Sequence, residues 1–364
     1  MADRVLVALS GGVDSSVAAR LLKEQGYDVV GAHMKLWDYV DVGGDLYRDG
    51  RCCSLDAVND CRQICHDMAA PFYVLNMSAP FREQVIEDFV SEYRLGRTPN
   101  PCVRCNTEIK WAAFLDKARA VGCDHIATGH YASVGQGDNG RWYVRRGADA
   151  TRDQSYVLWG LSQDALAMTL MPLGDLHKTE VRRIANKYNL RTADKKESRE
   201  ICFVADDDYR RFVREWEEKR GRRFEQGDIV LADGTVVGRH DGTTGFTIGQ
   251  RRGLGVAHPT PLYVQRLDVE NNRVIVGDND ALFRSELIAE NINWMALEAC
   301  DRPFAADVKI RYRHPAAPAT VTCLSDTCVR VVFNEKQRAI TPGQSVVFYD
   351  GERVLGGGII EATP

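Results

Sequence analysis

The residues best suited to chemistry begin at Ser10, in the segment SGGVDSS (residues 10–16). This segment follows an apolar strand pattern, residues 5–9, and opens a helix pattern that ends near Gly26. Two glycines allow a tight turn against a ligand, and the N–H groups of a first helical turn have no partner within the helix. Asp14 adds a carboxylate able to bind a metal ion. The segment therefore predicts an anion site suited to phosphate.

Two other interpretations of this segment are weaker. No lysine follows it, so it is not the loop that holds the terminal phosphates in P-loop proteins. A plain strand–turn–helix junction with a Ser or Asp as N-cap needs only one such residue, whereas this segment has two glycines and four oxygen-bearing side chains.

The second reactive segment is RTPNPCVRCN (residues 97–106). Pro99 and Pro101 predict a stiff loop without regular structure. Cys102 and Cys105 are close enough in sequence for a disulfide or for one metal centre. Three nearby basic side chains are expected to favour the thiolate form: Arg97, Arg104 and Lys110.

Cys202 is the third candidate thiol, in ESREICF (residues 197–203). A structural zinc site would need a second cysteine pair, and the chain offers none with convincing spacing. Its 11 cysteines, in a chain expected to have no signal peptide, are interpreted as reduced thiols, metal ligands or redox-active pairs. Cys323 and Cys328 fall in or beside expected strands and are interpreted as core or turn residues.

Composition and charge limit the class of protein. The chain has 364 residues, of which 44% are hydrophobic and 27% charged, and no run of about 18 apolar residues occurs. We expect a cytoplasmic protein with no membrane partner. Residues 141–223 carry 19 Lys or Arg and 14 Asp or Glu, a local +5 in a chain of net charge −4. A basic middle in an acidic chain suits a polyanionic partner.

The elements that must position these residues alternate between strands and helices in the first two hundred residues. Strands are expected at 4–9, 28–34, 71–75 and 124–128, and helices at 15–25, 55–68, 81–95 and 107–121. The pattern predicts an α/β fold with a doubly wound, mainly parallel sheet, whose ligands bind at the carboxyl ends of the strands. Residues 138–140 (Asp-Asn-Gly) predict the turn of an inserted hairpin.

Short strands with glycine-rich turns dominate after about residue 203. They predict a small mixed adaptor domain and then a C-terminal β-barrel. The expected domains are a catalytic domain at 1–205, the adaptor at 206–285 and the barrel at 286–364.

The chain resembles the bacterial tRNA-specific 2-thiouridylases, members of the ATP pyrophosphatase superfamily. The resemblance rests on seven segments in the family's order: SGGVDSS, GRTPNPCVRCN, ATGHYA, RDQSYVLWGL, ESREICF, TIGQRRGLG and KIRYRHP. It covers essentially the whole chain. It implies sulfur transfer to O2 of the wobble uridine of tRNA, with ATP and Mg²⁺ as cofactors and a sulfur donor protein, either a cysteine desulfurase or a relay carrier, as partner.

The resemblance also implies roles for individual residues. Cys105 corresponds to the nucleophile and Cys202 to the persulfide carrier, and Asp14 completes the catalytic set. The implied nucleotide-binding residues are Ala8, Leu9, Ser10, Gly11, Gly12, Val13, Asp14, Ser15, Met34 and Gly129. The implied contacts with the target base and tRNA are Asn100, Pro101, Cys102, His130, Arg152, Asp153, Gln154, Arg311, Tyr312 and Gln344.

One departure bears on mechanism, since many family members have Asp where this chain has Cys102. A persulfide route needs only two thiols, Cys105 and Cys202. A four-iron cluster route would use Cys102, Cys105 and Cys202 as ligands and leave one iron open for sulfide, and the third thiol favours this route. Two rival functions stay open: another ATP pyrophosphatase acting on a small metabolite, and a non-catalytic RNA-binding protein.

Overall fold

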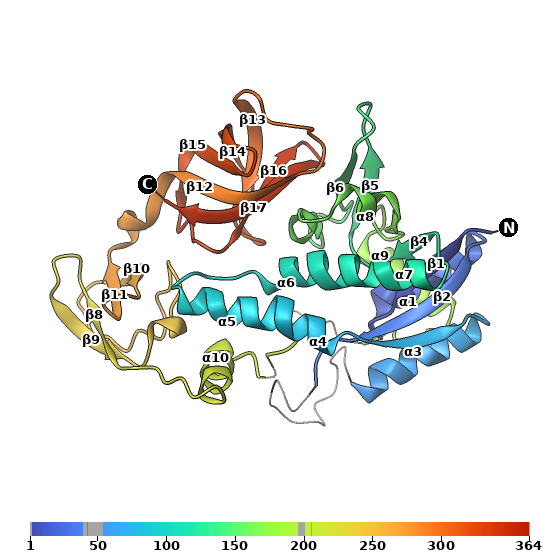
Figure 1. Ribbon diagram of the computed structural model, residues 1–364, viewed down its shortest axis with the longest axis horizontal. Coiled ribbons are helices and arrows are strands. Elements are labelled where there is room, and N and C mark those ends of the chain that lie inside the picture. The colour runs from blue at the N-terminus through green and yellow to red at the C-terminus, as the bar shows by residue number, and fades with distance from the viewer. Residues whose placement is uncertain (1, 39–41, 43–53, 196–200, 205, 364) are drawn as a thin grey trace.

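A computed structural model describes residues 2–38, 42, 54–195, 201–204 and 206–363 (Figure 1). A five-stranded sheet lies at one end of the molecule, and a β-barrel and a four-stranded sheet lie at the other. Two long helical segments run between these ends (Figure 1). The predicted fold class, a parallel α/β sheet followed by a mixed middle part and a C-terminal barrel, is confirmed.

The first sheet has the order β3-β2-β1-β4-β7, and all its neighbouring strands are parallel. Its strands are β1 (Arg4–Ala8), β2 (Asp28–Lys35), β3 (Phe72–Asn76), β4 (His125–Ala127) and β7 (Thr169–Leu170). The chain winds outward from β1 in both directions. The carboxyl end of β1 is therefore the switch point at which such sheets bind ligands.

Five helices of the described residues lie around this sheet, of which the first two match the expected helices at 15–25 and 55–68. They are α1 (Val13–Glu24), α3 (Leu55–Asp67), η3 (Ser155–Leu158), α8 (Gln163–Ala167) and α9 (Lys178–Lys187). The Ala57 N–H donates to the Ser54 hydroxyl at 3.2 Å, which caps α3 as expected. No helix of the described residues is long and apolar enough to cross a membrane.

Two continuous helical segments carry the cysteine motif and its support. One consists of α4 (Ser78–Phe81), η1 (Arg82–Ile86) and α5 (Glu87–Arg94), the other of α6 (Pro101–Arg104), η2 (Cys105–Ala113) and α7 (Phe114–Ala120). The predicted stiff loop over Cys102 and Cys105 is therefore wrong. Pro101 occupies the first helical position, where the missing N–H costs no hydrogen bond, and so begins the helix.

The middle and C-terminal parts are built mainly from strands. The middle part contains α10 (Tyr209–Glu218), β8 (Gly227–Val230), β9 (Val236–His240), η4 (Thr243–Gly245), β10 (Tyr263–Asp268) and β11 (Arg273–Gly277). After η5 (Asn279–Leu282) the barrel consists of β12 (Phe283–Trp294), β13 (Phe304–Lys309), β14 (Ala317–Ser325), β15 (Cys328–Arg338), β16 (Ser345–Asp350) and β17 (Arg353–Ala362). Pairing of β12 with β17 closes it.

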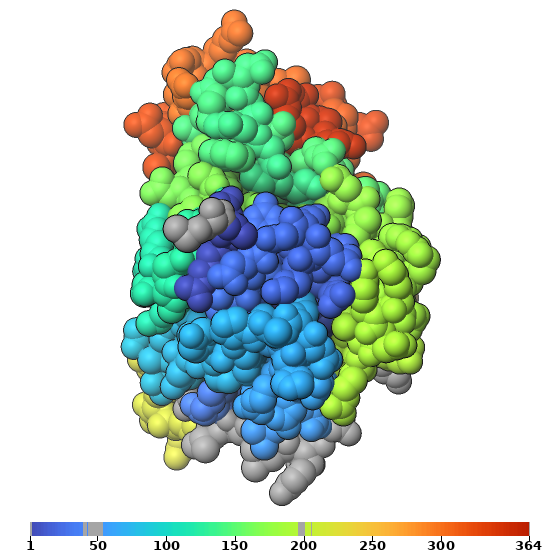
Figure 2. Space-filling model, turned by 90° about the vertical axis from the view of Figure 1, so that its right-hand side faces the viewer, coloured from blue at the N-terminus to red at the C-terminus, as the bar shows by residue number. Residues whose placement is uncertain are grey.

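The predicted hairpin joins the two ends of the molecule. Its strands are β5 (Ala132–Gln136) and β6 (Trp142–Arg146), and β6 pairs with β17 at the barrel edge. Arg141 donates to the carbonyls of Trp294 and Met295 at 2.7 and 2.8 Å. Figure 2 shows this part of the chain, in green, packed against the orange and red barrel.

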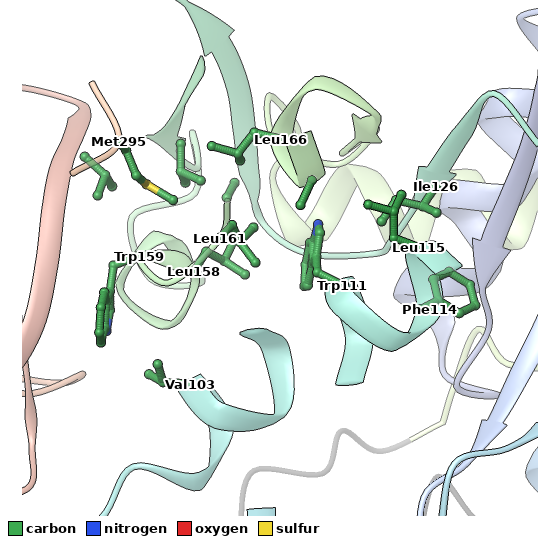
Figure 3. Packing of buried hydrophobic residues seen from close by; sticks show 14 of the residues in the cluster. Val103, Trp111, Phe114, Leu115, Ile126, Leu158, Trp159, Leu161, Leu166 and Met295 are labelled. Carbon is green, nitrogen blue, oxygen red and sulfur yellow. The ribbon is translucent and has the colours of Figure 1, made fainter. Parts of the chain in front are cut away.

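One apolar cluster runs from the parallel sheet to the barrel. It includes Trp111 near the sheet, Leu158 and Leu161 in the middle and Trp159 and Met295 on the barrel side (Figure 3). Burial of these side chains makes the catalytic part and the barrel share one core.

Cys323 differs from its predicted role, because it forms a disulfide with Cys300. The β13–β14 pairing places Phe304 opposite Val321, which brings the residues just before β13 beside the end of β14. The expectation of a plain core or turn cysteine at position 323 is therefore wrong.

Candidate active site

The segment 10–16 follows the carboxyl end of β1 and includes the first turn of α1, at the switch point of the sheet. Gly12 is the N-cap of α1, and no side chain caps this helix. Instead the hydroxyls of Ser15 and Ser16 donate to the Gly12 carbonyl at 3.2 and 2.7 Å. The plain N-cap interpretation is therefore wrong, and the first-turn N–H groups are placed for an anion.

Two glycines permit the close approaches that shape this loop. Gly11 has φ +72°, and a Cβ there would lie 2.7 Å from the Ala57 backbone of α3. A Cβ on Gly129, just beyond β4, would lie 2.6 Å from the Ser15 nitrogen. Any larger residue at either position would push neighbouring backbone away from the loop.

Asp14 is held by two side chains from distant parts of the chain. Lys178 Nζ lies 2.7 and 2.9 Å from the two carboxylate oxygens, and the Tyr131 hydroxyl donates to Oδ1 at 2.7 Å. The Lys178 side chain is 9% exposed. A loop without a lysine of its own thus receives one from the first turn of α9.

A second lysine reaches the loop from the other side. Lys195 Nζ donates to the Gly11 carbonyl at 3.0 Å and lies 3.0 Å from Asp60 Oδ2. Neither lysine was among the residues predicted for this site. The only available signal was the basic residue at the start of α9, a position where a positive charge opposes the helix dipole.

The other implied nucleotide residues surround the same strand ends. Ala8 ends β1, the Leu9 N–H donates to the Ala32 carbonyl at 2.8 Å, and Met34 lies near the end of β2. Their contact with a nucleotide stays a prediction.

Cys105 and Cys202 both adjoin one apolar cluster. Cys105 is buried in it, and Cys202 packs against it half-buried. Met34 packs against this cluster and also against the core that includes β1. Both predicted catalytic thiols therefore adjoin the same apolar cluster, which Met34 connects to the sheet that bears the nucleotide loop.

Cys102 lies one turn before Cys105 and is exposed. Protein atoms around the thiol raise the pKa of Cys102 by desolvation, while the charge of Lys110 acts in the opposite direction. Arg97 is paired with Glu92 and Glu361, and Arg104 with Asp88 and Glu108. The expected thiolate character is therefore wrong for Cys102, because desolvation of the sulfur by nearby protein atoms outweighs the effect of the Lys110 charge on its pKa.

His130 is buried beyond β4, beside Trp111, with ring centroids 5.2 Å apart. Its Nδ1 lies 2.8 Å from the Thr128 hydroxyl. Burial, and secondarily the charge of Lys110, hold the pKa of His130 well below its usual value. The imidazole is therefore neutral at physiological pH.

The barrel holds the loop in front of the cysteines. Gln344 Nε2 donates to the carbonyls of Thr98 and Pro99 at 2.9 and 3.1 Å. Asn100 is hydrogen-bonded to Tyr156, whose hydroxyl donates to the Ser345 carbonyl at 2.8 Å. These contacts place Asn100, Pro101 and Cys102 at the junction between the barrel and the catalytic part.

The implied tRNA residues at 152–154 divide into two kinds. Asp153 accepts from the Gly147 and Ser155 N–H groups, and Gln154 Oε1 accepts from the Tyr131 N–H at 2.9 Å. Both side chains therefore stabilise the loop itself. Arg152 is near Tyr312, whose pKa is raised by burial and by the nearby Asp153 and Cys102 and lowered by Arg152.

Four basic side chains gather around the tyrosines of this junction, and we call them the basic cluster: Arg146, Lys309, Arg311 and Arg338. Arg146 lies 4.0 Å from the Tyr349 ring, and Lys309 lies 5.6 Å from the rings of Tyr156 and Tyr312. Tyr312 is 40% exposed, so its ring is open to a ligand such as a base.

The three-thiol iron–sulfur ligand set stays a prediction. Among the described residues, no group of three or more His, Cys, Asp or Glu side chains is placed to hold a metal ion. Cys102 is exposed, whereas Cys105 is buried among apolar side chains. In this conformation the three thiols therefore do not form a ready ligand set.

Three family models match successive parts of the chain. They are described as a tRNA methyl transferase HUP domain (residues 3–206), a tRNA methyl transferase PRC-barrel domain (218–278) and an aminomethyltransferase beta-barrel domain (284–360).

Curated relatives are similar over nearly their full length. The chain is 52% identical to the tRNA-specific 2-thiouridylase MnmA of Geotalea uraniireducens, covering 98% of this chain and 95% of the relative. It is 50% identical to the protein of that name from Symbiobacterium thermophilum, covering 99% and 93%, and 45% identical to that from Clostridioides difficile, covering 99% of both.

Proposed function

Because this chain belongs to the tRNA-specific 2-thiouridylase family of sulfurtransferases, we propose that it replaces O2 of the wobble uridine of tRNA with sulfur, using ATP. The observation that supports this proposal is that Cys105 and Cys202 both adjoin one apolar cluster. Met34 joins that cluster to the sheet bearing the nucleotide loop. Such a site can activate an oxygen and deliver sulfur without either reagent leaving the protein.

Activation of the base takes place at the nucleotide loop. The first-turn N–H groups of α1 and the Lys178 ammonium bind phosphate oxygens, and O2 of the uracil attacks the α-phosphate as pyrophosphate leaves. Asp14 retains lone pairs beyond its contacts with Lys178 and Tyr131, so it fits Mg²⁺ held jointly with the phosphates. That ion would neutralise charge on the departing pyrophosphate.

Sulfur transfer then uses the two thiols. A sulfur donor protein converts Cys202 to a persulfide, whose terminal sulfur attacks C2 as AMP departs with the O2 oxygen. The Cys105 thiolate next attacks the Cys202 sulfur, which breaks the S–S bond and releases the 2-thiouridine. The products are the modified tRNA and a Cys105–Cys202 disulfide, which a dithiol reductant returns to two thiols.

The cluster route is retained as a second mechanism because Cys102 supplies a third thiol. Protein purified without oxygen should be assayed for iron and acid-labile sulfide, and Cys102→Ser for thiolation. Full activity in Cys102→Ser, or in protein free of iron, supports the persulfide pair. Loss of activity together with the brown absorbance supports the cluster.

The function itself is tested by incubating the protein with ATP, tRNA and a persulfide donor, and measuring AMP and 2-thiouridine. We expect both products only when tRNA is present. Cys105→Ala and Cys202→Ala should form no 2-thiouridine, whereas Cys123→Ala, a buried thiol outside the shared cluster, should retain activity. AMP formation that is independent of tRNA would favour a small-metabolite substrate instead.

A further inference from the structure

Arg338 lies at the end of β15, where the barrel meets the middle part of the chain. Its Nε donates to Asn279 Oδ1 at 2.8 Å, and its guanidinium carbon lies 5.3 Å from the centre of the Tyr263 ring in β10. The side chain is half-buried. These contacts fix the guanidinium at the junction between the barrel and the four-stranded sheet.

A second arginine reaches the main chain of Arg338. Arg311 Nη2 donates to the main-chain carbonyl of Arg338 at 3.1 Å. Burial, and secondarily the charge of Arg338, lower the pKa of Arg311. Within the described part of the chain, neither arginine forms an ion pair with a carboxylate. Two neighbouring positive charges without a counter-charge repel each other, and a bound anion would remove that repulsion.

The residue after Arg338 has a strained backbone and packs closely against the middle part of the chain. Ala339 has φ +52°, which is uncommon for a residue with a side chain. A Cβ on Gly249 would lie 2.8 Å from the Ala339 Cβ and 3.5 Å from Arg338 Nη1. Gly249 belongs to TIGQRRGLG, whose Thr247 hydroxyl lies 3.4 Å from that of Thr98, just before the cysteine motif. Strained residues of this kind persist where the surroundings fix them, and they cluster at binding sites.

We propose that Arg311 and Arg338 together bind one phosphate group of the RNA substrate, at the point where the three parts of the chain meet. This inference rests on the proposed function, which makes tRNA the substrate. Guanidinium groups match phosphate geometry with two donors each. ATP is the other source of phosphate, but the nucleotide loop lies at the opposite end of the molecule (Figure 1) and has its own lysines.

The test compares Arg338→Gln with Arg330→Gln in the full chain. Both variants remove one positive charge from the same strand. Arg330 serves as the control because it is already paired with Glu286. Affinity for tRNA is measured over a range of salt concentrations. Arg338→Gln should bind tRNA about tenfold more weakly. The slope of log affinity against log salt concentration should decrease in magnitude by about one, because one fewer phosphate contact releases counterions. Arg330→Gln should match the wild type in both respects.

Three further arms keep the test decisive if Arg338→Gln folds poorly. Arg338→Lys should keep the salt slope but lose part of the affinity, since the charge stays and the fork is lost. Arg311→Gln combined with Arg338→Gln should lose less than the product of the single losses, because both side chains hold one phosphate. ATP affinity should not change in any variant.

The outcomes separate this inference from the proposed function. An unchanged salt slope in Arg338→Gln, with tRNA binding weakened by Arg311→Gln, overturns the shared phosphate site and leaves the function intact. A loss of ATP affinity instead assigns the site to the nucleotide and overturns the RNA phosphate. No tRNA binding by the wild type overturns the proposed function itself.

Discussion

The nucleotide loop and the basic cluster differ in whether their basic side chains form ion pairs. At the loop, Lys178 is paired with Asp14 and Lys195 with Asp60. Among the residues described, none of the four side chains of the basic cluster forms an ion pair. The lysines at the loop are thus held in ion pairs, whereas in the part of the chain that the structure describes the cluster side chains are not. The charge of Asp153 nevertheless acts on Lys309.

This difference in charge pairing indicates which type of ligand each region binds. A paired lysine is held in position for a small ligand, and a carboxylate beside it can share a metal ion with phosphates. Unpaired guanidinium and ammonium groups attract a polyanion and release its counterions. We therefore expect ATP binding to tolerate salt and tRNA binding to depend on it.

The largest effect is expected from breaking the charge balance at the loop. Asp14→Ala should lower the rate of AMP formation by about 100-fold or more, because Lys178 loses its ion-pair partner and the site loses the carboxylate that would hold Mg²⁺. Affinity for tRNA should stay unchanged. Asp56→Ala, an exposed acid at the start of α3, is the control. A normal rate of AMP formation in Asp14→Ala would remove the loop from the reaction.

The next largest effect is expected at Gly129, where a substitution tests whether close packing at the loop is needed for ATP binding. Gly129→Ala should weaken ATP binding by about tenfold to 100-fold, because its Cβ would push α1 away from β4 and displace the first-turn N–H groups. Gly140→Ala has open space around it and should cost only about 1 kcal/mol of stability from its positive φ. Equilibrium titration with ATP compares the two, and equal affinities would contradict the loop geometry.

A smaller effect tests the unpaired charge of the cluster. Arg311→Gln should weaken tRNA binding about tenfold and flatten its salt dependence, while ATP affinity stays unchanged. Arg353→Gln on β17, paired with Asp350, should behave as the wild type. A wild-type tRNA affinity that is the same at low and physiological salt would show that the charge contrast has no role in binding.

The smallest effect concerns stability and pH. His130 stays neutral in the folded protein, and the unfolded chain takes up a proton below about pH 6.5. The unfolded state therefore binds more protons, and the free energy of unfolding should fall as pH drops from 6.5 to 5, by up to about 1.4 kcal/mol per pH unit for this group.

The measurement is denaturant unfolding of His130→Gln against the exposed His66→Gln. In His130→Gln, the free energy of unfolding should depend less steeply on pH, by the uptake of about one proton. Part of the pH dependence should remain in this variant, because burial also lowers the pKa of His240. An identical pH dependence in both variants would mean that His130 titrates normally in the folded state.

Local patterns made most of the parallel sheet predictable. The four expected strands match β1 to β4 within one residue at each end. Apolar strands and capped helices are short-range features, so one stretch of sequence contains the whole signal. Pro101 misled for the same reason, because proline ends a helix in most positions but begins one at the first.

The parts that could not be predicted depend on contacts between distant segments. Nothing near Asp14 in sequence indicates Lys178, and only folding brings α9 to the loop. The Cys300–Cys323 disulfide depends on strand register, and the position of Arg338 depends on a junction between separate parts of the chain. Side chains that act across such junctions leave no local pattern to read.

The central claim is that ATP activates the oxygen that sulfur replaces. A tRNA carrying ¹⁸O at O2 of the wobble uridine tests it directly, with mass spectrometry of the AMP after a single turnover. We expect one ¹⁸O atom in the AMP phosphate for each 2-thiouridine formed, because the C2–O2 bond breaks and AMP departs with that oxygen. Unlabelled AMP would contradict this mechanism, whether the ¹⁸O label is found in water or stays in the tRNA.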